Sequence, residues 1–178
     1  MSRAFVNESD AIEELPDRLV SDHPNYVTAE GLALIEGTIV GLREKFAKAQ
    51  LESDRNALAS VSRDLRYWDA RRATAVAIPP PADTSTVRFG SVVSIERNDG
   101  RRLAYRIVGE DEADPNKGLL SHVSPLARAL MGKGVGDVIR VGQGEAEITA
   151  IGSQADAGRA QIKKTVSNRD QNDTEGSD

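Results

Sequence analysis

Apolar residues between positions 29 and 78 recur at intervals of three and four, the spacing of a coiled-coil seam. The first stretch contributes Leu32, Ile35, Ile39, Leu42, Phe46 and Ala49. The second stretch contributes Leu58, Val61, Leu65, Trp68 and Ala75. In the second stretch Arg72 takes one seam position that should be apolar. The pattern predicts an antiparallel helical hairpin over residues 26–78.

A single antiparallel register brings the two seams together, with Ala49 opposite Leu58 near the turn and Leu32 opposite Ala75 at the base. The apex then lies between Ser53 and Asp54. An arm of about 22 residues, at ~1.5 Å per residue, holds this apex ~33 Å from the base.

The predicted tip is Ser53, Asp54 and Arg55, and its candidate acids are Glu52 and Asp54. A projecting hairpin with carboxylates at its end either carries those acids to a site on a partner or simply ends in a solvated turn.

The hairpin has clear predicted ends. Thr28 is a suitable N-cap for the first helix, with Glu30 well placed in its first turn. The three prolines at 79–81 end the second arm and open a stiff linker over residues 79–85. Residues 1–25 form an acidic N-terminal extension in which Pro16 and Pro24 interrupt any long helix.

After the linker, the apolar period changes from helical to two, which indicates strands. Val87, Val93 and Ile95 begin this pattern, with a kink expected at Gly90. Residues 98–100 read Asn-Asp-Gly, a strong signal for a β-hairpin turn. We expect a small antiparallel sheet of four strands with one short helix over residues 86–152. The complete prediction is therefore an α+β chain, followed by a mostly disordered tail over residues 153–178.

The short helix is predicted to begin at Ser124-Pro125, with serine as the N-cap and proline at the first helical position, and to stop at Gly132. The acidic residues at 110–114 precede it. They lack the alternate ligand spacing and the closing glutamate of a calcium loop, so a solvated acidic turn is the favoured interpretation.

The composition of the chain excludes several classes of protein. The chain has 178 residues and a formal net charge of −5, which argues against a general duplex-DNA binder. The second arm is locally positive, and a solvated face with i,i+4 pairs is the simplest explanation. There are no cysteines, and no apolar run approaches the ~18 residues of a membrane span. We expect a soluble cytoplasmic monomer that does not associate with membranes.

No autonomous active site is visible in the sequence. The chain has two histidines, His23 and His122, and it lacks a glycine-rich phosphate loop and a nucleophile elbow. An interaction protein without an intrinsic cofactor is favoured over an independent enzyme.

Several blocks then resemble one family in the same order. These are residues 106–114, Gly118 with Ser121, residues 124–133 and residues 135–138. Together they resemble the carboxy-terminal domain of the bacterial Gre-type transcription elongation factors, over roughly residues 86–152. Residues 26–32 and 63–67, together with Ile78, resemble parts of that family's hairpin.

This resemblance implies an FKBP-like domain that docks at the secondary channel of bacterial RNA polymerase, with the hairpin inserted toward the active centre. Nascent RNA would then be a further contact. The implied docking residues are Asp111, Glu112, Asp114, Ser124, Pro125 and Arg128. In the family, an aspartate and a glutamate at the tip help to hold the polymerase's second magnesium ion, and the polymerase hydrolyses its own backtracked transcript. Asp54 is the residue here that would contribute to Mg²⁺ binding, within a polymerase complex.

The chain departs from the family at this tip. The family pattern is roughly Gly-Asp-x-x-Glu-Asn-Ala, whereas residues 53–59 retain Asp54 and have Ala57 in place of the glutamate. The hairpin is also shorter by about 18 residues, which removes roughly 13 Å of reach.

Three functions follow. The favoured hypothesis is a polymerase-binding regulator of elongation with weak or absent stimulation of transcript cleavage. The second is an active cleavage factor that uses Glu52 and Asp54. The third is a non-transcriptional adaptor built on the FKBP-like domain, as in the short-hairpin Rnk proteins that this layout resembles.

Overall fold

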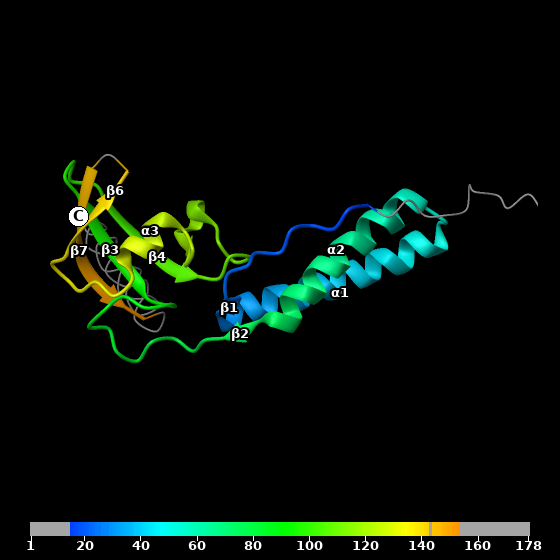
Figure 1. The fold of residues 1–178 in the computed structure, drawn as a ribbon, viewed down its shortest axis with the longest axis horizontal. Coiled ribbons are helices and arrows are strands. Elements are labelled where there is room, and N and C mark those ends of the chain that lie inside the picture. Colours follow the sequence, from blue (N-terminus) through cyan, green and yellow to red (C-terminus); the bar gives the residue numbers. More distant parts are fainter. Residues whose placement is uncertain (1–14, 143, 154–178) are drawn as a thin grey trace, which may run out of the picture. The chain divides into compact units, whose positions relative to one another are not determined.

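The computed structural model describes residues 15–142 and 144–153 (Figure 1). The chain is divided into two compact units. The first combines the segment that ends at Asn25 with Leu32–Ala75, and the second combines Tyr26–Gly31 with the chain from Val76 onward. The predicted tail lies outside the described residues from position 154, and the predicted extension is described only from Leu15.

Two long antiparallel helices form the first unit, as the seam predicts. Helix α1 is Ala29–Leu51 and helix α2 is Arg55–Thr74. Four of the predicted seam positions on α1 are buried: Ile35, Ile39, Leu42 and Ala49. The matching side chains of α2 are half-buried: Leu58, Val61, Leu65 and Trp68. Because this hairpin exposes polar residues on its outer faces, packing along one stripe is what stabilises it.

The predicted place of Arg72 in the seam is wrong. The neighbouring Arg71 is the buried arginine, with 1% of its surface exposed. Arg72 lies at the surface, where its Nε donates to Oε1 of Glu36 at 2.8 Å. An exposed ion pair keeps the guanidinium of Arg72 hydrated, which costs less than placing it among the apolar side chains.

Helix α2 ends four residues before the predicted Ile78. Ala75 adopts an extended conformation with ψ 125°, and strand β2, Val76–Ala77, pairs in parallel with strand β1, Tyr26–Val27. The amide of Ile78 then donates to the carbonyl of Val27 at 2.9 Å. Proline at position 79 disfavours a helical Ile78, so the chain forms strand hydrogen bonds here.

The second unit contains a five-stranded mixed sheet in the order β5-β4-β3-β7-β6. Strands β3 (Val92–Arg97) and β4 (Arg102–Val108) form the hairpin predicted around Asn98-Asp99-Gly100. Strands β6 (Val138–Val141) and β7 (Gly144–Gly152) form a second hairpin, and β7 also pairs with β3. The buried core under the sheet includes Val93, Ile95, Ile107, Leu130 and Ile148.

The predictions of four strands and of a purely antiparallel sheet are wrong. Strand β5, Leu119–Ser121, pairs in parallel with β4, and the 3₁₀ helix η2, Pro115–Lys117, precedes it. Strand β3 also begins later than predicted, because Gly90 turns the chain with φ +83°. Val87 and Phe89 are buried before that turn and contribute to the core without belonging to a strand.

The short helix α3, Pro125–Leu130, forms where the sequence predicts it. Ala127 and Leu130 are buried against the sheet. Gly132 follows with φ +76°, as expected of a residue that ends a helix.

Candidate functional site

The hairpin reverses at Ser53, within the predicted tip. The amide of Ser53 donates to Gln50 at 3.2 Å, and the amide of Asp54 donates to Ala49 at 3.0 Å. These two bonds form a Schellman motif, whose central residue normally adopts a left-handed conformation and is usually glycine. Ser53 takes that conformation with φ +54°. Among the described residues it is the only one other than glycine with a positive φ.

Asp54 begins the second helix. Its Oδ1 accepts from the amide of Ala57 at 3.0 Å, which makes it the N-cap of α2. A capping carboxylate satisfies an otherwise unpaired amide and interacts favourably with the helix dipole. One of the two carboxylate oxygens of Asp54 is therefore committed to the fold of the tip.

The other tip side chains are exposed. Glu52 lies 3.8 Å from Lys48 Nζ, in an i,i+4 ion pair with more than half of each side chain in solvent. Arg55 is also exposed. Over residues 15–142 and 144–153, no three acidic, histidine or cysteine side chains gather into a group that could hold a metal ion. The tip therefore offers two exposed acids, Glu52 and Asp54, of which Asp54 also caps α2.

The acidic loop before η2 differs from the predicted solvated turn. Glu112 is buried, with 8% of its surface exposed. The hydroxyl of Thr28 lies 2.7 Å from both of its carboxylate oxygens. Glu112 thus lies in the interior of the second unit, where its carboxylate accepts a hydrogen bond from Thr28.

Asp114 and Asp111 remain partly exposed. Asp114 caps η2 by accepting from the amide of Asn116 at 3.1 Å, and it pairs with Lys117 Nζ at the same distance. Its hydrogen bond with Lys117 lowers the pKa of Asp114 below its usual value. The carboxylate therefore stays charged well into acidic conditions.

Helix α3 presents the remaining predicted docking residues. Ser124 Oγ accepts from the amide of Ala127 at 3.2 Å, as predicted for an N-cap, so this hydroxyl stabilises the helix start. Pro125 and Arg128 are exposed. Helix α3 contacts β5, the strand that follows the acidic loop and η2. Of the predicted docking residues, Pro125 and Arg128 are thus exposed on α3, and Asp111 is half-buried in the acidic loop.

A family model for the carboxy-terminal domain of transcription elongation factors GreA/GreB matches residues 82–152. Transcription elongation factor GreB of Xanthomonas axonopodis pv. citri (strain 306) is 36% identical over 126 residues, covering 70% of this chain and 71% of the relative. Transcription elongation factor GreA of Chelativorans sp. (strain BNC1) is 35% identical over 130 residues, covering 72% of this chain and 80% of the relative. This chain belongs to the GreA/GreB family.

Among solved structures, the crystal structure of GreA factor homolog 1 (Gfh1) of Thermus thermophilus is similar to this GreA/GreB family member at 20% identity. The match covers 74% of this chain and all of that chain, with a TM-score of 0.37.

Sequence analysis missed the contacts that hold the first turn of α1 inside the second unit of this GreA/GreB family member. Besides the bond from Thr28 to Glu112, Arg106 donates from Nη2 to Glu30 at 3.0 Å. A Cβ at Gly31 would lie 2.5 Å from Oε2 of Glu112, so a larger residue there would have to displace the Glu112 carboxylate. The available signal was a glycine, Gly31, in the first turn of a predicted helix. A glycine there indicates a close neighbour but does not identify the side chain that approaches it.

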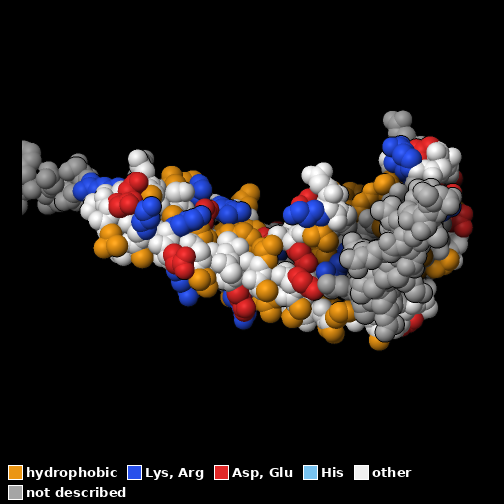
Figure 2. Space-filling view, turned by 180° about the vertical axis from the view of Figure 1, so that it is seen from behind, with side chains coloured by type: hydrophobic (Ala, Val, Ile, Leu, Met, Phe, Trp, Pro, Cys, Tyr) orange, Lys and Arg blue, Asp and Glu red, His pale blue; other side chains and the backbone are white. Residues whose placement is uncertain are grey.

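The face of the hairpin drawn in Figure 2 is mixed in charge. Figure 2 shows basic and acidic side chains interspersed along the helical hairpin, without a large area of one sign on that face. Among the described helices, none is long and apolar enough to cross a membrane.

Proposed function

We propose that this GreA/GreB family member binds bacterial RNA polymerase at its secondary channel and regulates elongation there, with weak or absent stimulation of transcript cleavage. In this proposal the protein acts in the cytoplasm as a monomer and is not itself an enzyme. The RNA chemistry belongs to the polymerase, and any magnesium ion is shared with the polymerase active site.

The observation that carries this proposal is the state of the tip. The resemblance places a glutamate three residues after the tip aspartate, and the residue there is Ala57. The remaining aspartate, Asp54, uses one carboxylate oxygen to cap α2. Holding a metal ion and orienting a water needs several hard oxygen ligands, so loss of one acid removes much of what the tip can supply.

Reach gives a second argument. Helix α1 has 23 residues, which corresponds to ~34 Å of helix. A hairpin that is longer by about 18 residues over its two arms would reach roughly 13 Å further. Because a misplacement of ~1 Å can cost ~100-fold in a rate that depends on positioning, a short hairpin is poorly suited to cleavage.

Exposure of Glu52 supports the second candidate, an active cleavage factor. Only an exposed ion pair with Lys48 is described for the Glu52 carboxylate, and such pairs contribute little energy. Glu52 can therefore turn toward a metal ion at low cost, beside Asp54. In this alternative the two acids flank Ser53 and replace the missing glutamate.

The test uses backtracked elongation complexes assembled with the cognate polymerase. Binding is followed by fluorescence anisotropy of a dye on Asn98→Cys, which is unique because the chain has no cysteine. RNA shortening is followed in the same samples. Binding without faster shortening supports the proposal, whereas shortening that Asp54→Ala abolishes supports the second candidate. Absence of binding contradicts both and favours an adaptor for another partner.

Docking through α3 is tested separately with Arg128→Ala and Asp111→Ala. We expect each to weaken polymerase binding by about tenfold, since a charged side chain within an interface can contribute ~1–2 kcal/mol. Arg102→Ala is the matched control, because Arg102 is an exposed arginine of β4 paired with Glu96. Equal affinities for all three variants would show that docking uses another surface.

A further inference from the structure

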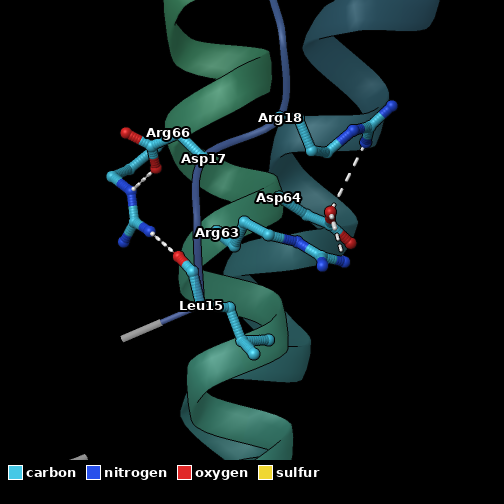
Figure 3. Close-up of polar contacts among 6 residues, drawn as sticks. All are labelled: Leu15, Asp17, Arg18, Arg63, Asp64 and Arg66. Carbon is cyan, nitrogen blue, oxygen red and sulfur yellow. Dashed lines mark hydrogen bonds and ion pairs between the residues drawn. The ribbon is translucent and has the colours of Figure 1, made fainter. Parts of the chain in front are cut away.

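An extended segment of the first unit runs beside helix α2 (Figure 3). We call this segment, Leu15–Asn25, the strap. It precedes the region matched by the family model, which begins at residue 82, and it meets α2 near both of its ends.

The inner end of the strap is held by buried hydrogen bonds. Asn25 has 5% of its surface exposed. Its Nδ2 donates to the carbonyl of Arg71 at 2.7 Å and to Oγ1 of Thr74 at 3.1 Å. Breaking such bonds leaves buried polar groups without partners, which makes this end of the strap a firm anchor.

The outer end is held by exposed charges. Oδ1 of Asp17 accepts from Nε of Arg66 at 2.6 Å, and the carbonyl of Leu15 accepts from Nη2 of the same arginine at 3.2 Å. Arg18 lies 3.4 Å from Asp64. The guanidinium of Arg18 also stacks 4.0 Å from the ring centroid of Tyr67. Figure 3 shows Arg66 and Asp64 meeting different residues of the strap.

These two ends differ in how easily they open. The Asp17 side chain is 71% exposed and its partner Arg66 is 40% exposed, and Arg18 is 41% exposed. Exposed ion pairs are weak and are screened by salt, and a surface cation–π contact is similarly modest. The outer half of the strap can therefore leave α2 while Asn25 stays in place.

The strap lies along the half of α2 nearer its carboxyl end. Its contacts extend from Thr74 to Asp64, so they leave residues 55–63 of α2 without a described strap contact. While it is bound, the strap is a third segment of the chain beside the two helices. It also pairs Arg66 with Asp17, an acid of the same molecule. Leu19, at its middle, is 96% exposed and does not attach the strap to the hairpin.

We propose that the strap is an autoinhibitory device that limits how the hairpin engages RNA polymerase. The bound strap makes the hairpin wider than its two helices alone. Full insertion into a channel that accepts two helices therefore requires release of Leu15–Arg18 from α2. This inference rests on the proposed function and adds a regulatory step to it. Release precedes binding, and the measured affinity is reduced by the fraction of molecules in which the strap is bound.

Strap release is measured first in the free, full-length protein. Nitroxide labels on Leu19→Cys and Gln50→Cys, both exposed positions of the first unit, report their separation by pulsed electron resonance. We expect a narrow distance distribution in the parent protein and a broad one in Asp17→Asn and in Arg18→Gln. Asp22→Asn is the matched control, since Asp22 is an exposed acid of the same strap. A narrow distribution in all four proteins would overturn the inference.

Polymerase binding is then compared among the same variants. Asp17→Asn and Arg18→Gln change the net charge in opposite directions, so a simple charge effect moves their affinities apart. Strap release instead raises both affinities, by about threefold each, as expected when weak exposed contacts restrict the competent state. Asp22→Asn should bind like the parent protein.

The outcomes separate this inference from the proposed function. If the parent protein binds polymerase and neither release variant binds more tightly, the strap is not inhibitory and the proposed function stands. If no variant binds polymerase, the proposed function and the inhibitory strap both fail. Tighter binding of both release variants, with unchanged Asp22→Asn, supports the inference.

Discussion

At the scale of single residues, Ser53 adopts a backbone conformation that is unfavourable for serine and favourable for glycine. It closes a Schellman motif with φ +54°, a left-handed conformation that costs an L-residue ~1 kcal/mol and glycine almost nothing. The tip pattern implied by the resemblance has glycine at this position, and the serine found here adopts a conformation that favours glycine.

Ser53→Gly should therefore stabilise the hairpin by ~0.5–1 kcal/mol. Urea unfolding followed by far-UV circular dichroism, which the two long helices dominate, measures this change. Ser60→Gly is the control, because Ser60 lies inside α2, where glycine should destabilise by ~0.5–1 kcal/mol. Equal effects of the two substitutions would contradict the left-handed conformation of Ser53.

Asp99 shows how a turn residue can carry a pH dependence. Its Oδ2 accepts from Nη2 of Arg101 at 2.6 Å, and its Oδ1 accepts from the Arg101 amide. The side-chain hydrogen bond, followed by the backbone bond, lowers the pKa of Asp99 to about 2. Ionised Asp99 therefore stabilises the β3–β4 turn above its ordinary pKa.

Because this pKa is lowered on folding, the stabilisation is present above pH ~4 and is lost as the pH falls toward 2. An NMR titration of the Asp99 carboxyl carbon should give a pKa near 2, and Arg101→Ala should return it toward 3.8. A pKa near 3.8 in the parent protein would show that the Arg101 contact does not persist in solution.

At the scale of elements, the first turn of α1 is held in the second unit by Thr28. Its Oγ1 accepts from the amide of Gly31 at 3.0 Å and donates to the buried carboxylate of Glu112. One hydroxyl therefore caps a helix and solvates an acid that water scarcely reaches. A buried acceptor that loses its donor costs ~1–3 kcal/mol.

Thr28→Val should destabilise the second unit by ~2–3 kcal/mol, because it removes both hydrogen bonds and keeps the side-chain shape. Thr28→Ser keeps the hydroxyl and should cost less than ~1 kcal/mol. Hydrogen exchange of amides in β4 and β5 reports the stability of this unit. Similar losses for valine and serine would mean that the methyl group, not the hydroxyl, is the important part of Thr28.

Elements with many repeated local signals were predictable. Hairpin helices follow from apolar spacing, and the start of α3 follows from Ser124-Pro125. Strand β5 has three residues and β2 has two, and strands this short show no periodic pattern. The parallel pairing of β5 with β4 and that of β2 with β1 were therefore missed.

Candidate site residues were predictable only where the signal is local. The position of Asp54 at the hairpin turn follows from the register of the seam, whereas its role as the N-cap of α2 was not predicted. The bond from Thr28 to Glu112 joins residues 84 positions apart, and the strap contacts join residues 46 to 51 positions apart. A single sequence does not encode such pairings in spacing or composition. Arg71 and Arg72 are adjacent, and a turn of only ~100° around the helix decides which of them is buried.

At the scale of the whole molecule, family membership and the tip lead to different expectations. The GreA/GreB relatives carry names that describe transcription elongation factors, and the match covers most of each relative described above. The tip of this chain has one acid in the expected place, and that acid caps a helix. The function proposed above, a polymerase-binding regulator with weak or absent stimulation of cleavage, is consistent with both observations.

The most direct measurement is the rate of RNA shortening in backtracked elongation complexes with saturating protein. We expect the same rate as with polymerase alone, within about twofold, while anisotropy shows that the protein is bound. Asp54→Ala should leave that rate unchanged. An increase of about tenfold or more, lost in Asp54→Ala or Glu52→Ala, would contradict the account and establish an active cleavage factor.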